Sequence, residues 1–499
     1  MTSSAQPVHH LLAGKIVKGA IWSALESWGQ HAVMFAIFIV LARLLGPEAL
    51  GLALLALSFP LIISAALTKG FSDSLVQRTA LSNEHQDSIF WLLLGTGSLA
   101  ALALSLASGL IAASFGHAEL ASLVRWASLL IFFTCAATVP AATLRRDLAF
   151  RTLAMRTLTG TLAGGGMGCV MAYADYGAWS IVTMQLARCA VEAAYLLLAS
   201  SWQPRLRFSA SRCRELTPFA LPLSLSTAWN SLNDELPKLF LGGFLGPVQV
   251  GLYSLARRPL EFLTSALLSP ISSVTMPAVA RMQGDVRRIE IYYANAIRIA
   301  AIAGFPAFAG LAVIAPDLVP LVLGDKWTGS ITAVQIIMML GLIRCVDSIA
   351  YGLVLAHGHS VTIVCFNVAY TVTITILLLF ASRIGLEAAL FAIILANLAV
   401  LPAFLIVAKR QTGINVLGPL ARLPRIALAS AIMVGAVLAW RSLWAPSPSE
   451  PLFILSAIAV GALAYVAAAF SLLKSDIDET RELLARALPS WSGVLGSRK

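Results

Sequence analysis

Long apolar segments alternate with short polar intervals along almost the whole chain. A helix needs about 20 mainly apolar residues to cross a hydrocarbon core of about 30 Å. About 14 segments fit this length. They are residues 19–43, 50–69, 88–113, 120–143, 153–173, 177–200, 216–240, 250–274, 291–315, 329–355, 361–380, 386–408, 426–440 and 452–473. The pattern predicts an all-α integral membrane protein with about 14 transmembrane helices.

Composition supports this class. The 499 residues are 59% hydrophobic and 12% charged, with a mean hydropathy of +0.84, which is too apolar for a soluble protein of this length. Residues 1–13 lack the features of a removable signal peptide, so no cleavage is expected. The cysteines contain no CxxC pair and are interpreted as packing residues, with no metal site or disulfide framework: Cys135, Cys169, Cys189, Cys213, Cys345 and Cys365.

The basic residues follow the alternation of the polar intervals. The intervals on the side of the termini hold 22 Lys and Arg, whereas the opposite intervals hold Lys326, Arg383 and Arg441. Because cytoplasmic loops carry the excess of basic residues, both termini are predicted to be cytoplasmic. The net charge of +11 is therefore explained by membrane topology, and nucleic acid is not an expected partner.

An internal repeat divides the chain. Residues 41–56, LARLLGPEALGLALLA, and residues 241–256, LGGFLGPVQVGLYSLA, are identical at eight of 16 positions. Both copies join the first and second helices of a six-helix set on the predicted periplasmic side, so the repeats are parallel. A recurring Gly-Pro turn is the alternative, but the match extends beyond it.

The repeat predicts four parts. Residues 1–200 form an N-terminal lobe of six helices and residues 201–410 a second, parallel six-helix lobe. Residues 411–475 add two extra C-terminal helices, and residues 476–499 form a cytoplasmic tail. Two such lobes can rock to expose a site between them to alternate sides of the membrane.

Several segments resemble the polysaccharide-synthesis family of lipid-linked oligosaccharide flippases. This family lies in the multidrug, oligosaccharidyl-lipid and polysaccharide exporter superfamily. The resemblance is carried by SLNDELPKLFLGGFLGPVQVGLYSLARRP (231–259), GAIWSALESWGQ (19–30), PAATLRRDLAFRTLA (140–154) and LGDKW (323–327), and it extends to about residue 410.

The resemblance implies a transporter of the bacterial inner membrane. Its expected cargo is an undecaprenyl-pyrophosphate-linked oligosaccharide, moved from the cytoplasmic to the periplasmic leaflet by alternating access for exopolysaccharide, capsule or O-antigen assembly. Membrane lipids, a polysaccharide polymerase and export machinery are the other expected partners.

Charged residues inside the apolar segments need a partner, water or a function. Four pairs have the helical spacing that brings opposite charges together: Asp234 with Lys238, Arg188 with Glu192, Arg258 with Glu261, and Arg344 with Asp347. Mutual neutralisation and a direct substrate role both remain open for these pairs. Glu26 and Arg298 have no oppositely charged residue within four positions on their own helices.

These residues supply the candidate site. Arginines suit a pyrophosphate group, so Arg298, Arg344 and Arg188 are the candidate phosphate ligands. Asn230 and Asn233, with Trp28 and Trp229, are candidates for the sugars.

Coupling to an ion gradient would require a carboxylate that can lose its charge or bind a cation. Glu26 is the first candidate, followed by Asp234 and Glu235, and Pro237 is expected to free helix carbonyls nearby. A proton or sodium gradient is the expected energy source, and no cofactor is expected.

Two other functions compete. A multidrug or small-solute antiporter would favour an apolar or acidic cavity, whereas this chain places at least as many basic as acidic residues in its spans. A membrane glycosyltransferase or polymerase needs positioned acids or bases and a sizeable extracytoplasmic loop. The longest predicted periplasmic interval, residues 316–328, is short, so enzyme activity and catalytic residues are not expected.

Overall fold

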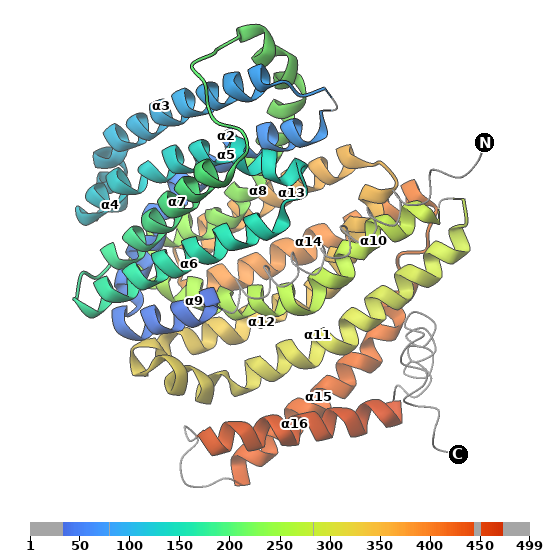
Figure 1. The fold of residues 1–499 in the computed structure, drawn as a ribbon. Helices are drawn as coiled ribbons and strands as arrows, with labels where there is room; N and C mark the ends of the chain where they lie inside the picture. The colour runs from blue at the N-terminus through green and yellow to red at the C-terminus, as the bar shows by residue number, and fades with distance from the viewer. Residues whose placement is uncertain (1–32, 79, 283, 444–450, 473–499) are drawn as a thin grey trace. The chain divides into compact units, whose positions relative to one another are not determined.

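The computed structural model describes residues 33–78, 80–282, 284–443 and 451–472. Within these residues the regular structure is entirely helical (Figure 1). Eleven of the described helices are long and apolar enough to cross a membrane. Helices α6 (Phe150–Tyr173), α8 (Ala210–Leu245) and the shorter Val33–Leu45 occupy the remaining predicted spans. The all-α membrane fold is therefore confirmed.

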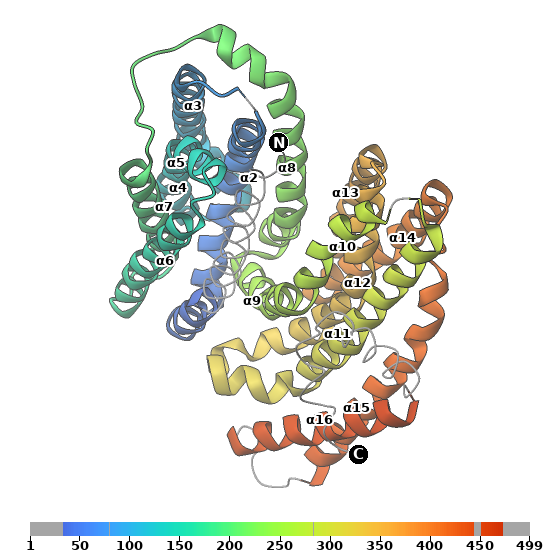
Figure 2. The same cartoon turned by 45° about the vertical axis from the view of Figure 1, so that its right-hand side comes forward.

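The chain divides into two compact units, Met1–Ser254 and Leu255–Lys499. In the first unit, Val33–Leu45 is followed by α2 (Pro47–Gln77), α3 (Asn83–Phe115), α4 (Glu119–Ala127), α5 (Leu129–Arg146), α6, α7 (Trp179–Ala199), α8 and the start of α9 (Pro247–Leu263). Helix α2 packs on α8 and α5, and α6 packs along α7 (Figure 2).

The second unit continues α9 through a π-helical turn, Thr264–Leu268, into α10 (Ser269–Arg281). It then holds α11 (Val286–Leu323), a 3-10 turn Asp325–Ser330, α12 (Ile331–Ala356), α13 (Ser360–Ala381) and α14 (Leu386–Thr412). A second 3-10 turn, Gly418–Arg422, leads to α15 (Leu423–Leu443) and α16 (Pro451–Leu472). The last two helices pack on each other and on α11. The boundary between the compact units, at residues 254 and 255, differs from the boundary at residues 200 and 201 that the repeat predicts. The two lobes therefore stay a prediction.

The two copies of the LGP motif have the same backbone geometry. Gly46 ends one helix with φ 84° and ψ 172°, and Gly246 ends another with φ 86° and ψ 177°. These positive φ values favour glycine, and a proline then begins the next helix in both copies. Equivalent turns were predicted from the repeat, and the backbone confirms them.

The two copies also contact each other reciprocally. A Cβ atom at Gly51 would lie 1.8 Å from the carbonyl oxygen of Pro247, and one at Gly251 would lie 2.0 Å from that of Pro47. Each glycine therefore accommodates the first residue of the other helix. The two contacts are therefore equivalent under the repeat, because Gly51 and Gly251, like Pro47 and Pro247, are 200 residues apart. All four residues lie within the first unit.

One predicted boundary is wrong. Helix α11 continues through Pro316 and Pro320 to Leu323, so most of the predicted interval 316–328 is helical. Asp317 thereby becomes a buried helix residue whose Oδ1 lies 3.2 Å from Nη2 of Arg441 in α15. The two residues are 124 positions apart in the sequence, so local spacing rules could not predict this ion pair.

Candidate functional site

A cationic cluster lies between α6 and α7 in the first unit. Nε of Arg188 donates to Oε1 of Glu192 at 2.9 Å, which confirms the predicted pair. Nε of Arg156, on the neighbouring helix, lies 3.7 Å from the other oxygen of Glu192. Two guanidinium groups therefore share one carboxylate, and the cluster keeps one excess positive charge.

Glycines of α6 make room for this cluster. A Cβ atom at Gly160 would lie 2.4 Å from Cγ of Glu192, and one at Gly164 would lie 2.7 Å from Cβ of Arg188. Small residues at four-residue spacing let membrane helices approach closely. Gly160 and Gly164 therefore leave room for the side chains of Glu192 and Arg188 on α7.

A second cluster joins α2 to α8. Oε2 of Glu235 accepts hydrogen bonds from Oγ of Ser58 at 2.5 Å and from Nζ of Lys238 at 2.6 Å. Ser58 is fully buried, and the side chain of Glu235 is 10% exposed. Lys238 therefore binds Glu235, the residue next to its predicted partner Asp234.

The other candidates on α8 do not share this position. Asn230 and Asp234 are exposed and one helical turn apart, and Asn233 is partly buried, whereas Glu235 faces α2. Helix α8 continues through Pro237, which has no backbone N–H to donate within the helix. The structure therefore separates Glu235 from the predicted sugar ligands on the same helix.

Two arginines of the second unit differ in their surroundings. Arg298 is 2% exposed, and its Nη2 donates to Oδ1 of Asn295 at 2.7 Å. The side chain of Arg344 is 42% exposed, and its Nη1 donates to Oδ2 of Asp347 at 3.0 Å. The predicted pair Arg344 and Asp347 is confirmed, and Asn295 is a partner of Arg298 that charge counting missed.

The fourth predicted pair is also formed. Nη1 of Arg258 lies 3.3 Å from Oε2 of Glu261, and Nε of Arg257 lies 2.8 Å from Oε1. Glu26 and Trp28 lie outside the described residues.

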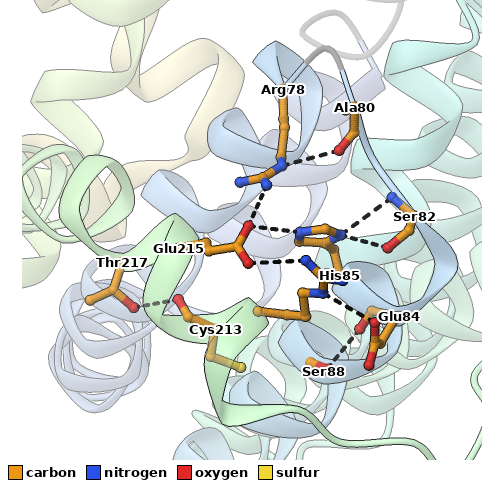
Figure 3. A network of polar contacts seen from close by, with 10 residues as sticks. Arg78, Ala80, Ser82, Glu84, His85, Ser88, Cys213, Glu215 and Thr217 are labelled. Atoms are coloured by element: carbon orange, nitrogen blue, oxygen red, sulfur yellow. Dashed lines mark hydrogen bonds and ion pairs between the residues drawn. The ribbon is translucent and has the colours of Figure 1, made fainter.

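A polar network fixes the start of α8 to the start of α3 (Figure 3). Glu215 binds Arg78, His85 and Arg212, and Arg212 also lies 3.1 Å from Glu84. The backbone N–H of Ser82 donates to Nδ1 of His85, so Nε2 carries the ring proton and donates to Glu215.

This network lies before the predicted span of α8. The hydrogen bond from His85, followed by that from Arg78, lowers the pKa of Glu215 from 4.5 to about 2. The carboxylate therefore stays ionised throughout the physiological range.

The segment between α7 and α8 is attached to the same helix end. Oδ1 of Asp87 accepts hydrogen bonds from Nε1 of Trp202 at 3.0 Å and from the backbone N–H of Arg205 at 3.3 Å. Oγ of Ser88 accepts one from the backbone N–H of Ser209 at 2.9 Å. The start of α3 thus holds the connection that leads into α8.

Two site residues were missed by sequence reasoning. Arg156 has no carboxylate four positions away on its helix, and Ser58 is an ordinary small residue in an apolar segment. The signal for Arg156 was its charge within a predicted span, which deserved the same weight as Arg188. No sequence signal marked Ser58.

All six cysteines are free thiols. Among the described residues, no group of three or more His, Cys, Asp or Glu side chains is placed to hold a metal ion.

Comparison with protein families gives a match over most of the chain. The family described as "Polysaccharide biosynthesis protein" matches residues 40–332, which is more than half of the sequence. The chain belongs to this family. The family predicted from the sequence motifs is thereby confirmed.

Curated relatives cover much of the chain. The lipopolysaccharide biosynthesis protein WzxC of Escherichia coli is 27% identical over 366 residues, covering 72% of this chain and 74% of WzxC. The succinoglycan biosynthesis transport protein ExoT of Rhizobium meliloti is 25% identical, covering 63% of this chain and 64% of ExoT.

Solved structures share the fold. The lipid II flippase MurJ, in an inward closed conformation, gives a TM-score of 0.73 at 13% identity, covering 92% of this chain and all of MurJ. An inward-facing multidrug resistance transporter of the MATE family gives 0.63 at 17% identity, covering 77% of this chain and 94% of that one. These values show that the chain shares the fold of both proteins, and they do not identify its cargo.

Proposed function

We propose that this protein flips an undecaprenyl-pyrophosphate-linked oligosaccharide from the cytoplasmic to the periplasmic leaflet by alternating access. The observation that carries the proposal is family membership over residues 40–332, together with relatives named for lipopolysaccharide biosynthesis and succinoglycan transport. Exopolysaccharide, capsule or O-antigen assembly is the process it would serve.

The arrangement of charge supports a cargo with an anionic group. Arginines of the apolar helices form clusters in which the basic groups equal or outnumber the acidic ones, as with Arg156, Arg188 and Glu192. An excess positive charge in a membrane helix is unfavourable unless an anion or water stabilises it. A pyrophosphate group would supply that anion.

The individual site assignments extend this proposal. Arg298, Arg344 and Arg188 would contact the pyrophosphate. Asn230 and Asn233 would bind the sugars. In the coupling step a proton or sodium ion would act on Glu26, Asp234 or Glu235. For Glu235, protonation would weaken the ion pair with Lys238 and so alter the contact between α2 and α8.

The protein would act with the machinery of polysaccharide synthesis. A polymerase and export proteins in the same membrane would use the cargo once it reaches the periplasmic leaflet. The basic polar intervals would face the cytoplasm, where the lipid-linked unit is made.

Likeness to the MATE transporter favours one alternative, export of small cationic solutes. The excess positive charge of the cluster between α6 and α7 opposes it, because a cation would be repelled there. A membrane glycosyltransferase receives no comparable support from the relatives named above.

Depletion of the protein in its host tests the proposal. The lipid-linked repeat unit should accumulate in the cytoplasmic leaflet, because synthesis continues while translocation stops. Leaflet location can be measured by accessibility to an impermeant glycosidase in oriented membrane vesicles. Accumulation in the periplasmic leaflet would point to a polymerase instead and would reject the flippase assignment.

A further inference from the structure

Arg156 and Arg188 are partly buried arginines of the first unit whose side chains have unused donors. All polar contacts of Arg188 are made by Nε with Glu192. Both terminal nitrogens of its guanidinium are therefore left without a partner among the described residues. Nη2 of Arg156 donates to Oγ1 of Thr157 at 2.9 Å, and its buried Nε has no hydrogen-bond acceptor.

The net charge of the cluster also favours an anionic ligand. Two arginines and one glutamate leave one excess positive charge, and their side chains are only 22%, 21% and 15% exposed. Unsatisfied N–H groups and an unbalanced charge are both costly where water is scarce. An anion with several acceptor oxygens would satisfy both at once.

The geometry of Arg188 suits a phosphoryl group. Glu192 holds Arg188 through Nε, which leaves the two terminal nitrogens of the planar guanidinium as a fork. Gly160 and Gly164 leave the space in which Glu192 and Arg188 lie, so the orientation is fixed by the packing of α6 on α7.

The position along the helices fits a ligand that enters from one leaflet. Arg156 lies near the start of α6, and Glu192 lies about two turns before the end of α7. This is the end of the bundle that carries Arg145, Arg146 and Arg151, which is the predicted cytoplasmic side.

We propose that Arg156 and Arg188, with Glu192 as the positioning residue, form a binding site for the phosphoryl groups of a lipid pyrophosphate between α6 and α7. The assignment of a lipid pyrophosphate as the ligand rests on the proposed function. The site itself rests on the unused donors, the excess charge and the packing. Arg156 becomes a ligand that none of the local sequence rules indicated.

Binding to the purified full-length protein tests the site. The probe is farnesyl pyrophosphate, and its dissociation constant is measured by thermophoresis in detergent. Arg156→Gln and Arg188→Gln should each weaken binding about tenfold, the value expected for loss of one charge-assisted contact of about 1.4 kcal/mol. Glu192→Gln should bind at least as tightly as the parent, because it removes a negative charge while its amide oxygen can still accept from Nε of Arg188.

Arg125→Gln is the matched control. Arg125 is an exposed arginine of the same unit, in the last turn of α4, and its replacement should leave binding unchanged. A merely structural cluster gives a different result, because Glu192→Gln would then lose binding as strongly as Arg188→Gln. That result, or unchanged binding by both arginine variants, overturns the site.

Competition identifies the source of the phosphoryl group. Inorganic pyrophosphate should displace the probe, whereas phosphatidylglycerol in mixed micelles at the same concentration should not. Displacement by phosphatidylglycerol would assign the site to bulk lipid and overturn the cargo assignment.

Translocation in proteoliposomes separates this site from the proposed function. Loss of probe binding in the arginine variants supports the site even if the parent moves no lipid-linked oligosaccharide. A parent that translocates, with a double arginine variant that binds and translocates equally well, overturns the site and leaves the function intact.

Discussion

Glu215 is the residue on which the polar contacts at the start of α8 converge. It binds Arg78 at the end of α2, His85 in α3 and Arg212 in its own helix. One carboxylate therefore joins three helices at the same end of the first unit. Sequence spacing could indicate only the contact with Arg212, which lies three residues away.

The lowered pKa of Glu215 predicts a pH dependence. A carboxylate with a folded pKa below its ordinary value stabilises the fold above that ordinary value, and the stabilisation is lost as pH falls. For Glu215 this window runs from 4.5 down to about 2, so thermal stability should show no contribution from its titration between pH 5 and pH 8.

Thermal unfolding in detergent measures the effect. Glu215→Gln should be less stable than the parent at pH 7, and the difference should shrink as pH falls below 4.5. Glu119→Gln, in the first turn of α4, provides a control at a site outside this network. A difference that grows on acidification would contradict the assigned direction of the pKa shift.

The buried charges show what local patterns can predict. The pairs Arg188 with Glu192 and Arg344 with Asp347 follow from helical spacing alone, and both are formed. Arg156 was missed because its carboxylate lies on another helix. Ion pairs between helices depend on how the helices pack, and local sequence spacing does not predict that packing.

At the scale of elements, α2 and α9 cross at very short range. Gly51 and Gly251 each face the backbone carbonyl of the proline that begins the other helix. A backbone atom cannot move aside as a flexible side chain can. An added methyl group must therefore separate the helices.

Gly51→Ala and Gly251→Ala should each destabilise the protein by about 1–3 kcal/mol, the usual cost of overpacking. Their effects should be similar, because the two contacts are reciprocal. Gly109→Ala is the matched control, since nothing lies within 4 Å of a Cβ atom there and alanine favours a helix. Unfolding monitored by intrinsic fluorescence measures the change, and parental stability in both crossing variants would show that the helices do not meet this closely.

Helix positions were predictable, whereas some helix ends were not. Apolar length located all the spans within the described residues, because lipid demands about 20 apolar residues per crossing. The end of α11 was misplaced because Pro316 and Asp317 are typical of a helix boundary. A packed helix tolerates prolines that a propensity rule would exclude.

Contacts between distant segments can be compared with the side of the membrane predicted for each segment. In the first unit, Arg145 lies 3.5 Å from Asp73, joining two predicted cytoplasmic segments, and the two LGP turns lie together on the opposite side. In the second unit, the backbone N–H of Asn415 donates to Glu290 at 2.6 Å, which again joins predicted cytoplasmic segments. In each unit, these contacts join segments that were predicted to lie on the same side of the membrane.

The absolute orientation remains a prediction from the charge bias. A reporter enzyme that is active only in the cytoplasm should be active when fused after Lys499. A thiol reagent that cannot cross the membrane should label Asp325→Cys from the periplasm in a cysteine-free background. Labelling of this position only from the cytoplasm would invert the topology.

Translocation of a lipid-linked oligosaccharide by the purified protein in liposomes tests the central claim most directly. The substrate is a fluorescent undecaprenyl-pyrophosphate oligosaccharide, and its arrival in the opposite leaflet is read from quenching by an impermeant reductant. Liposomes with the protein should show saturable translocation well above that of protein-free liposomes. Transport of a cationic dye without movement of the lipid-linked oligosaccharide would contradict the flippase account and favour an antiporter.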